Sequence, residues 1–206
     1  MTRRNAGAGS GDNRGIARYL RRHGIHVVTA ESCTAGLIAS RIAEVPGCGD
    51  VLYCAIVAYS PSAKEQLLRV PSGTIRRYGL TSEEVSLAMA LGAMQLTGVD
   101  LALANTGVAD DGGDGDTPAG TQCFAWVFRR PGHAGRAGRA LEDAPAGVAV
   151  FTETRRFPGE RNAVREAAAD WALARICHYH ELARRGEGNR AAAPDELPDT
   201  PAGATA

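Results

Sequence analysis

The stretch that decides the fold runs from residue 25 to residue 45 and reads IHVVTAESCTAGLIASRIAEV. It opens with an apolar run over Ile25–Thr29, which predicts a buried strand. Apolar residues then recur at helical spacing from Leu37 to Val45, which predicts a helix over Thr34–Glu44. A short polar turn joins the two elements. The stretch is therefore a strand–turn–helix unit, from which α/β proteins are built.

Further strands and helices alternate along the rest of the chain. Apolar runs predict strands over Val51–Ala58, Val99–Asn105, Thr121–Phe128 and Val148–Arg155. Apolar stripes predict helices over Arg14–His23, Pro61–Leu68, Ser82–Leu96 and Glu160–Arg184. This alternation predicts an α/β fold, a three-layer α/β/α sandwich. Because the last two strands read as a hairpin, we expect a mixed central sheet that is mostly parallel.

Two of the helix starts carry capping residues. Ser60 with Pro61 in the first turn predicts the start of the helix over Pro61–Leu68. Thr81 and Glu84 have the spacing of a capping box, which predicts Thr81 as the N-cap of the helix over Ser82–Leu96.

The composition argues against several classes of protein. A chain of 206 residues is long enough for one domain. Its 23 basic and 23 acidic residues cancel, which argues against a general nucleic-acid binder. No apolar run reaches the roughly 18–20 residues that a membrane helix needs. The five cysteines contain no C-x-x-C pair, so neither a zinc site nor a disulfide framework is implied, and free thiols fit a cytoplasmic protein.

Three stretches lack the periodicity of a packed element. Residues 1–12 predict a disordered N-terminal arm, and residues 186–206, rich in Ala, Pro and Gly, predict a flexible C-terminal tail. Residues 130–147 predict a long loop inside the domain. The folded domain is therefore expected to occupy residues 13–185.

The turn in the opening stretch places Ser32 beside the start of a helix. Unpaired backbone N–H groups at such a position can stabilise a developing oxyanion, so Ser32 is a candidate nucleophile. The alternative is that Ser32 or Thr34 only caps the helix. Cys33 is a rival nucleophile, because helix N-termini activate thiols.

Lys64 is the only lysine of an arginine-rich chain. It follows the expected cap Ser60 by about one turn, where the helix dipole and partial burial both disfavour a charged amine. A neutral lysine can serve as the general base for a serine. The alternative is a solvated surface lysine. Tyr59 is either a hydrogen-bond partner at the same site or a half-buried residue at the end of a strand.

Two later segments carry candidate ligand-binding residues. Residues 105–121 follow a buried strand and are rich in Gly and Asp, and ligands of open α/β sheets bind at such strand ends. The aspartates do not match a calcium loop, so no metal site is expected, and a flexible surface loop is the alternative. Arg161 and Arg165 lie in the first turns of the last helix, where phosphate binds well. Their alternative is a solvated position.

In this order and spacing, the four segments resemble the CinA C-terminal domain family. The motifs that carry the resemblance are Glu31-Ser-Cys-Thr, Ala58-Tyr-Ser with Lys64, Ser82-Glu-Glu-Val, Thr106-Gly and Phe157-x-Gly-x-Arg161. The resemblance extends from about residue 14 to about residue 182.

The resemblance implies an amidohydrolase that converts nicotinamide mononucleotide to nicotinic acid mononucleotide and ammonia, with no cofactor and no metal. It implies Ser32 as the nucleophile, with Lys64 and Tyr59 as its activating partners. The substrate-binding residues that it implies are Glu31, Cys33, Thr34, Gly36, Thr106, Gly107 and Arg161. The family often carries an N-terminal nucleotide-binding domain, and this chain looks like the stand-alone form. We expect a cytoplasmic homo-oligomer that binds a pyridine nucleotide and neither nucleic acid nor membrane.

Two positions depart from the family pattern. Ala35 stands where the family usually has glycine, which matters if that residue needs a positive φ. Asp110 and Asp111 stand where the family usually has Gly and Pro, and carboxylates facing the pocket would repel a nucleotide phosphate. Two other functions therefore stay open: an amidohydrolase of the same fold acting on a non-phosphorylated amide, and a non-catalytic binding member of the family.

Overall fold

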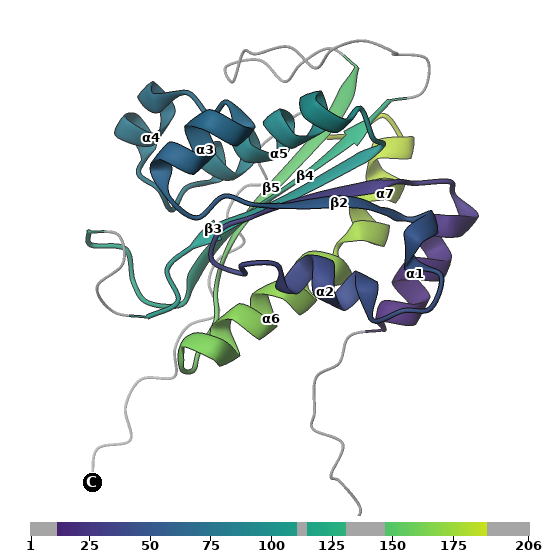
Figure 1. Ribbon diagram of the computed structural model, residues 1–206, viewed down its shortest axis with the longest axis horizontal. Coiled ribbons are helices and arrows are strands. Elements are labelled where there is room, and N and C mark those ends of the chain that lie inside the picture. The colour runs from purple at the N-terminus through teal and green to yellow at the C-terminus, as the bar shows by residue number, and fades with distance from the viewer. Residues whose placement is uncertain (1–11, 111–114, 131–146, 189–206) are drawn as a thin grey trace, which may run out of the picture.

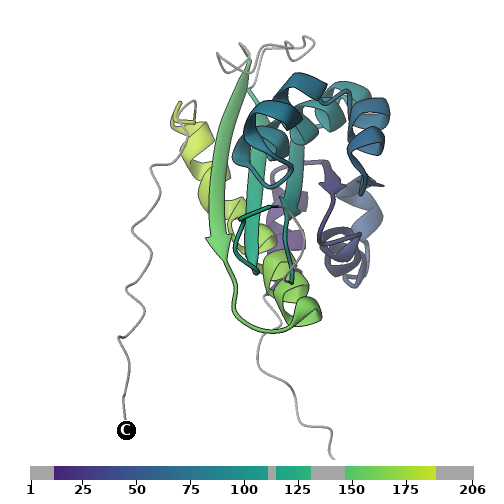
Figure 2. The same cartoon turned by 90° about the vertical axis from the view of Figure 1, so that its left-hand side faces the viewer.

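The computed structural model describes residues 12–110, 115–130 and 147–188. A five-stranded sheet lies between two layers of helices (Figures 1 and 2). The predicted three-layer α/β/α sandwich is therefore confirmed. The N-terminal arm predicted over residues 1–12 lies outside the described residues except for Asp12. Most of the loop predicted over 130–147 and most of the tail predicted over 186–206 lie outside them as well.

The strands lie side by side in the order β2-β1-β3-β4-β5. Their bounds are β1 (Val27–Glu31), β2 (Leu52–Val57), β3 (Leu101–Gly107), β4 (Thr121–Arg129) and β5 (Val148–Arg156). β1 pairs in parallel with β2 and β3, whereas β4 pairs antiparallel with β3 and β5. Among these strands β4 alone therefore runs against the others, and the expected hairpin makes the sheet mixed.

The helices divide between the two faces of the sheet (Figure 2). One face is covered by α3 (Pro61–Leu68), α4 (Ser72–Tyr78) and α5 (Glu83–Thr97). The other is covered by α1 (Asn13–Arg22), α2 (Leu37–Ala43), α6 (Arg161–Ala174) and α7 (Ile176–Arg184). A short 3-10 turn, η1 (Cys48–Asp50), leads into β2.

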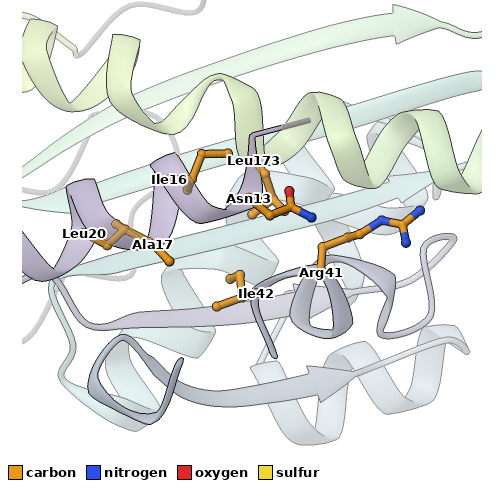
Figure 3. Close-up of a pocket in the computed structure, with 7 residues that line it drawn as sticks. All are labelled: Asn13, Ile16, Ala17, Leu20, Arg41, Ile42 and Leu173. Carbon is orange, nitrogen blue, oxygen red and sulfur yellow. The ribbon is translucent and has the colours of Figure 1, made fainter. Parts of the chain in front are cut away.

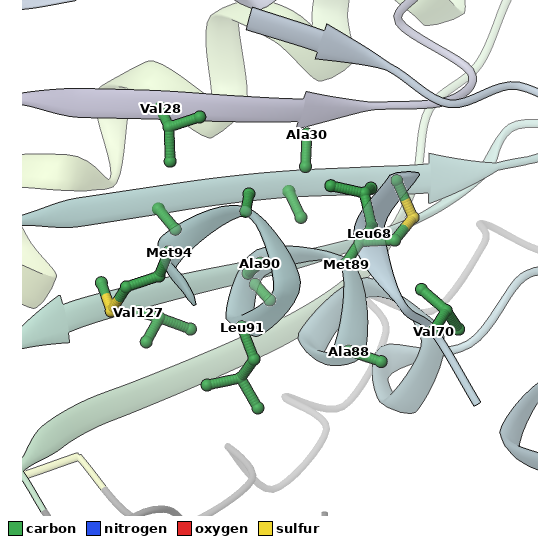
Figure 4. Close-up of a cluster of buried hydrophobic side chains, with 14 of the residues drawn as sticks. Val28, Ala30, Leu68, Val70, Ala88, Met89, Ala90, Leu91, Met94 and Val127 are labelled. Carbon is green, nitrogen blue, oxygen red and sulfur yellow. The ribbon is translucent and has the colours of Figure 1, made fainter. Parts of the chain in front are cut away.

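Residue size on the two faces of the strands decides how each helix packs. Under α5 the sheet presents small side chains such as Ala102 and Ala104, so the helix lies close to the strands. Figure 4 shows Met89 and Ala90 of α5 in the same hydrophobic cluster as Val28 and Ala30 of β1. The opposite face presents large residues, which fill the space below α6 and α7: Leu101, Leu103, Phe124, Trp126 and Phe128. The sandwich thus has one large hydrophobic cluster on each side of the sheet.

Two predicted helix starts differ from the structure. The helix after Ser32 begins at Leu37 rather than at Thr34, because Gly36 adopts a left-handed conformation with φ +93°. The turn is therefore longer than expected. The predicted N-cap at Thr81 is wrong, since α5 is capped by the next residue, Ser82, whose Oγ accepts the Val85 N–H at 3.3 Å.

Two further helical features were not predicted. Helix α4 lies between α3 and α5 and contributes a buried Thr74 and a partly buried Ile75. The single helix predicted over Glu160–Arg184 is divided at Arg175 into α6 and α7. A continuous apolar stripe crosses this joint, so the sequence pattern does not show it.

Candidate active site

A cavity of about 190 Å³ opens at the carboxyl ends of the three parallel strands β1, β2 and β3. It is lined by seven of the ten predicted site residues: Ser32, Cys33, Tyr59, Lys64, Thr106, Gly107 and Arg161. Three of its other lining residues, Val108, Ala109 and Asp110, lie in the candidate ligand-binding segment 105–121. The remaining two, Leu80 and Thr81, were not predicted to line a site. Strand ends of this kind are the usual ligand position in open α/β sheets.

Ser32 and Lys64 meet inside this cavity. The Lys64 Nζ lies 2.8 Å from Ser32 Oγ, and the lysine side chain is 1% exposed. Lys64 reaches the serine from α3, whose start is capped by Ser60 Oγ accepting the Ala63 N–H at 3.1 Å. The predicted cap and helix bounds are confirmed here. The solvated-lysine alternative is wrong, because the amine is buried.

The surroundings of the Lys64 amine orient it toward Ser32. Nζ also donates to the backbone oxygens of Ala58 at 2.9 Å and Tyr59 at 3.0 Å. These carbonyls only accept hydrogen bonds, so a neutral amine would give them its two protons. Its lone pair would then face Ser32 Oγ, which is the geometry of a general base.

Burial also changes the acidity of the amine. It lowers the pKa of Lys64 from 10.5 to about 8, because a charged ammonium loses its hydration in the cavity wall. With this pKa roughly a tenth of the amine is neutral at pH 7, and about half is neutral at pH 8. This combination of contact and pKa is typical of a lysine that activates a serine.

The Ser32 turn is anchored to the neighbouring strand by Asn105. The Ser32 N–H donates to the Asn105 backbone oxygen at 3.0 Å, and the Thr34 N–H donates to Asn105 Oδ1 at 3.2 Å. Within the described residues, the Cys33 N–H between them has no hydrogen-bond partner. The amide that follows the candidate nucleophile is thus left available for an oxyanion.

Glu31 does not line the cavity, and its side chain contacts the backbone of the Ser32 turn and the start of α2. Its fully buried carboxylate accepts the backbone N–H groups of Gly36, Ile38 and Ala39 at 2.8–3.1 Å. It also accepts the Thr29 hydroxyl at 2.9 Å. A carboxylate at the start of α2 satisfies N–H groups that a helix otherwise leaves unpaired. The structure therefore places Glu31 as a support of the Ser32 turn.

Thr34 and Gly36, which were also expected to bind substrate, do not line the cavity either. Thr34 is fully buried, and its Oγ1 has no hydrogen-bond partner in the described part of the chain. Gly36 supplies the left-handed residue that ends the turn. Both residues therefore belong to the framework of the turn.

Ala35, the residue before Gly36, has a φ of +48°. Alanine therefore replaces the family's usual glycine at a position where the backbone conformation strains any residue with a side chain. The structure holds the strained residue between the Ser32 carbonyl, which accepts the Ala35 N–H at 3.0 Å, and the N–H contact of Gly36 with Glu31.

Cys33 lines the cavity but is poorly suited as a nucleophile. It is 4% exposed, and burial raises the pKa of its thiol above 9.0. Its Sγ accepts a hydrogen bond from Gln122 Nε2 at 3.3 Å. Gln122 also accepts the Asn105 amide at 3.1 Å and so ties β4 to the site. No local motif in the sequence indicates Gln122, because its role comes from the pairing of β3 with β4.

Arg161 reaches the cavity from the first position of α6. Its Nη1 contacts both carboxylate oxygens of Asp110 at 2.9 and 3.0 Å, and its Nη2 donates to the Tyr59 hydroxyl at 2.8 Å. The Tyr59 hydroxyl is thus engaged by Arg161, while its backbone oxygen contacts Lys64. Asp111 lies outside the described residues.

Arg165 has a different position from Arg161. Its Nε and Nη2 donate to the backbone oxygens of Cys33 at 2.9 Å and Thr34 at 3.2 Å. Arg165 does not line the cavity, and its guanidinium holds the Ser32 turn against α6. Of the two candidate arginines, Arg161 is the one placed to contact a ligand.

Other parts of the described chain carry less chemistry. Figure 3 shows a hollow between α1, α2 and α6, lined largely by apolar side chains such as Ile16 and Leu173 and too narrow for a water molecule. Within the described ranges, His, Cys, Asp and Glu side chains do not gather in threes around a possible metal position. No helix in those ranges has the length and hydropathy needed to cross a bilayer.

Comparison with known sequences identifies a family for this chain. The model of the CinA C-terminal domain matches residues 13–180. A CinA-like protein of Geobacter sulfurreducens is 40% identical over 166 residues, which cover 78% of this chain and 36% of the relative. A CinA-like protein of Akkermansia muciniphila is 36% identical over 170 residues, with coverages of 82% and 37%. The chain spans little more than a third of the length of these curated relatives.

Solved structures of similar proteins have the same fold. A competence-damaged protein (CinA) superfamily protein from Klebsiella pneumoniae is 31% identical with a TM-score of 0.69, covering 84% of this chain and 96% of that one. Another superfamily member, from Escherichia coli, is 28% identical with a TM-score of 0.68, covering 80% and 86%. The names of these proteins specify a family and no reaction.

Proposed function

The chain belongs to the CinA C-terminal domain family, and from that membership and its pocket we propose that it is a serine amidohydrolase acting on nicotinamide mononucleotide. The observation that carries the proposal is the 2.8 Å contact between the buried Lys64 amine and Ser32 Oγ. A lysine with a lowered pKa beside a serine is an arrangement suited to acyl transfer. A purely capping role for Ser32 would not need a buried amine.

The proposed reaction uses Ser32 Oγ as the nucleophile. Neutral Lys64 takes the hydroxyl proton as Oγ attacks the carboxamide carbon, and the Cys33 N–H stabilises the oxyanion. The C–N bond then breaks, and Lys64 returns the proton to the departing ammonia. A water molecule hydrolyses the acyl-enzyme, with Lys64 again as the base, and releases the carboxylic acid. These steps use neither a cofactor nor a metal ion.

The substrate is proposed from the family resemblance and from the position of Arg161. A guanidinium at the start of a helix is suited to a phosphate group. Arg161 lines the same cavity as the Ser32–Lys64 pair, and it donates from the start of α6 to the Tyr59 hydroxyl. The carboxamide would therefore point toward Ser32 and the phosphate toward Arg161. Assembly into a homo-oligomer stays a prediction from the resemblance.

Release of ammonia from nicotinamide mononucleotide tests the proposal. The wild-type protein should release ammonia, and Ser32→Ala should reduce the rate at least about a thousandfold. Ser62→Ala, a change of the same kind on the exposed surface of α3, is the matched control and should keep the wild-type rate. Normal ammonia release by Ser32→Ala would exclude the proposed mechanism.

Asp110 favours a second candidate function, an amidohydrolase of the same fold acting on a phosphate-free amide. Its carboxylate forms an ion pair with the Arg161 guanidinium, the group that a phosphate would bind. The phosphate-free substrate nicotinamide riboside separates the two candidates. A higher kcat/KM for the riboside than for the mononucleotide would favour the second.

A further inference from the structure

We propose that Asp110 is a specificity-determining residue that occupies Arg161 as an internal anion, so that an anionic substrate group has to displace it. The inference rests on the proposed function for the identity of the substrate. It concerns the charge selectivity of the pocket, whereas the proposed function concerns the reaction at Ser32.

The contact has the geometry of anion binding. Both carboxylate oxygens of Asp110 lie within 3.0 Å of Arg161 Nη1. The second terminal nitrogen, Nη2, is taken by the Tyr59 hydroxyl. Asp110 thus supplies to Arg161 what two oxygens of a phosphate would supply. A phosphate in the same place would meet a like charge unless the Asp110 side chain moved away.

The pair is also able to open. The side chains of Arg161 and Asp110 are 47% and 52% exposed, and an ion pair in contact with water is weak. It joins the end of β3 to the start of α6 and shares no residue with the Ser32–Lys64 contact. The pair therefore acts as a competitor for the ligand and not as a permanent block.

The size of the cavity supports this reading. Its volume of about 190 Å³ is below the roughly 300–1,000 Å³ of pockets that enclose small molecules. A cavity whose anion-binding end is filled by a protein carboxylate is expected to be small. Displacement of Asp110 would free both the guanidinium and the space beside it.

Binding of ribose 5-phosphate, measured by calorimetry, tests the inference without any hydrolysis. Asp110→Asn keeps the shape of the side chain and removes its charge, so the Kd should fall by about three- to tenfold. Asp116→Asn removes the same charge from an exposed position of the same loop and is the matched control. Its Kd should stay within about twofold of the wild type. An unchanged Kd in Asp110→Asn, or an equal fall in Asp116→Asn, would overturn the inference.

A double-mutant comparison separates occupation of Arg161 from general repulsion. In an Arg161→Gln background, Asp110→Asn should no longer tighten ribose 5-phosphate binding, because the competed group is gone. A gain of the same size in that background would overturn the inference. In the active enzyme, the ratio of KM for nicotinamide mononucleotide to KM for the riboside should fall in Asp110→Asn and not in Asp116→Asn.

The two proposals fail separately. If Asp110→Asn binds ribose 5-phosphate more tightly but the wild type releases no ammonia from the mononucleotide, only the proposed function is contradicted. If the wild type releases ammonia but Asp110→Asn binds ribose 5-phosphate as the wild type does, only the inference is contradicted.

Discussion

Lys64 Nζ and Ser32 Oγ lie 2.8 Å apart although the two residues belong to different layers of the sandwich. Ser32 stands on the turn from β1 to α2, and Lys64 is in α3 on the opposite face of the sheet. The two side chains meet at the carboxyl ends of the parallel strands, where the turn after β1 and helix α3 reach the same edge of the sheet.

Replacement of Lys64 by arginine should be nearly as damaging as replacement by alanine. Arginine keeps the charge but stays protonated, so it cannot take the Ser32 proton. In the wild type, kcat/KM should rise with pH and level off above an apparent pKa of about 8, the value to which burial lowers Lys64. Ammonia release across the pH range measures both effects. Retention of most activity in Lys64→Arg would identify the lysine as an electrostatic clamp.

Burial of Lys64 should also make stability depend on pH. The folded pKa of about 8 lies below the ordinary value of 10.5, so the unfolded chain binds the proton more tightly. The resulting destabilisation is complete below the folded pKa and is lost as the pH rises through the unfolded pKa. From about pH 7 to about pH 10, the free energy of unfolding of the wild type should therefore gain roughly 2–3 kcal/mol relative to Lys64→Met.

Urea denaturation of both proteins over this pH range measures that difference. Ser32→Ala keeps the buried amine and is the control, so it should follow the wild type. Parallel curves for the wild type and Lys64→Met would show that the amine titrates at the same pH in the folded and unfolded states.

Cys33→Ala should keep activity within a few-fold of the wild type. Burial raises the pKa of this thiol, which makes a thiolate nucleophile scarce near neutral pH. The change removes the Sγ that accepts from Gln122, so a loss of stability of about 1 kcal/mol is expected. Assays of ammonia release and of urea unfolding check the two parts. A loss of activity as large as that of Ser32→Ala would identify Cys33 as the nucleophile.

Glu31→Gln should destabilise the Ser32 turn. One carboxylate oxygen becomes an NH2 group that faces backbone N–H donors of α2, and the negative charge at the helix start is lost. We expect a loss of about 2–3 kcal/mol in the free energy of unfolding and a larger effect on kcat than on KM. Glu44→Gln, at the exposed end of the same helix, should cost less than about 0.5 kcal/mol. Equal losses in the two variants would show that the carboxylate does not hold the turn.

Ala35→Gly should stabilise the protein. The φ of +48° costs an L residue about 1–2 kcal/mol, and glycine recovers most of it against a smaller entropic penalty. A net gain of about 0.5–1 kcal/mol in urea unfolding is expected. Ala43→Gly, at an exposed helical position of α2, should instead lose up to about 1 kcal/mol. A loss in both variants would mean that the surroundings of Ala35 relieve the strain.

Local features of the sequence determined the elements and part of the site. The apolar periodicities predicted every strand and the order of the main helices, because side-chain spacing reports directly which face is buried. The Ser60–Pro61 cap predicted α3 with its observed bounds, since a cap and its helix are neighbours in the chain. For the same reason the sequence placed Ser32 on a strand–helix turn and Lys64 near the start of a helix.

The tertiary structure alone decided which of these groups meet. Contacts such as Lys64 with Ser32, Gln122 with Cys33 and Arg161 with Asp110 join residues that are 32, 89 and 51 positions apart. They depend on strand order and on the register of β1, β3 and β4, which periodicity does not encode. Glu31 and Arg161 show the consequence. Both belong to recognisable motifs. Burial against α2 makes Glu31 a support of the turn, whereas Arg161 lines the cavity and pairs with Asp110.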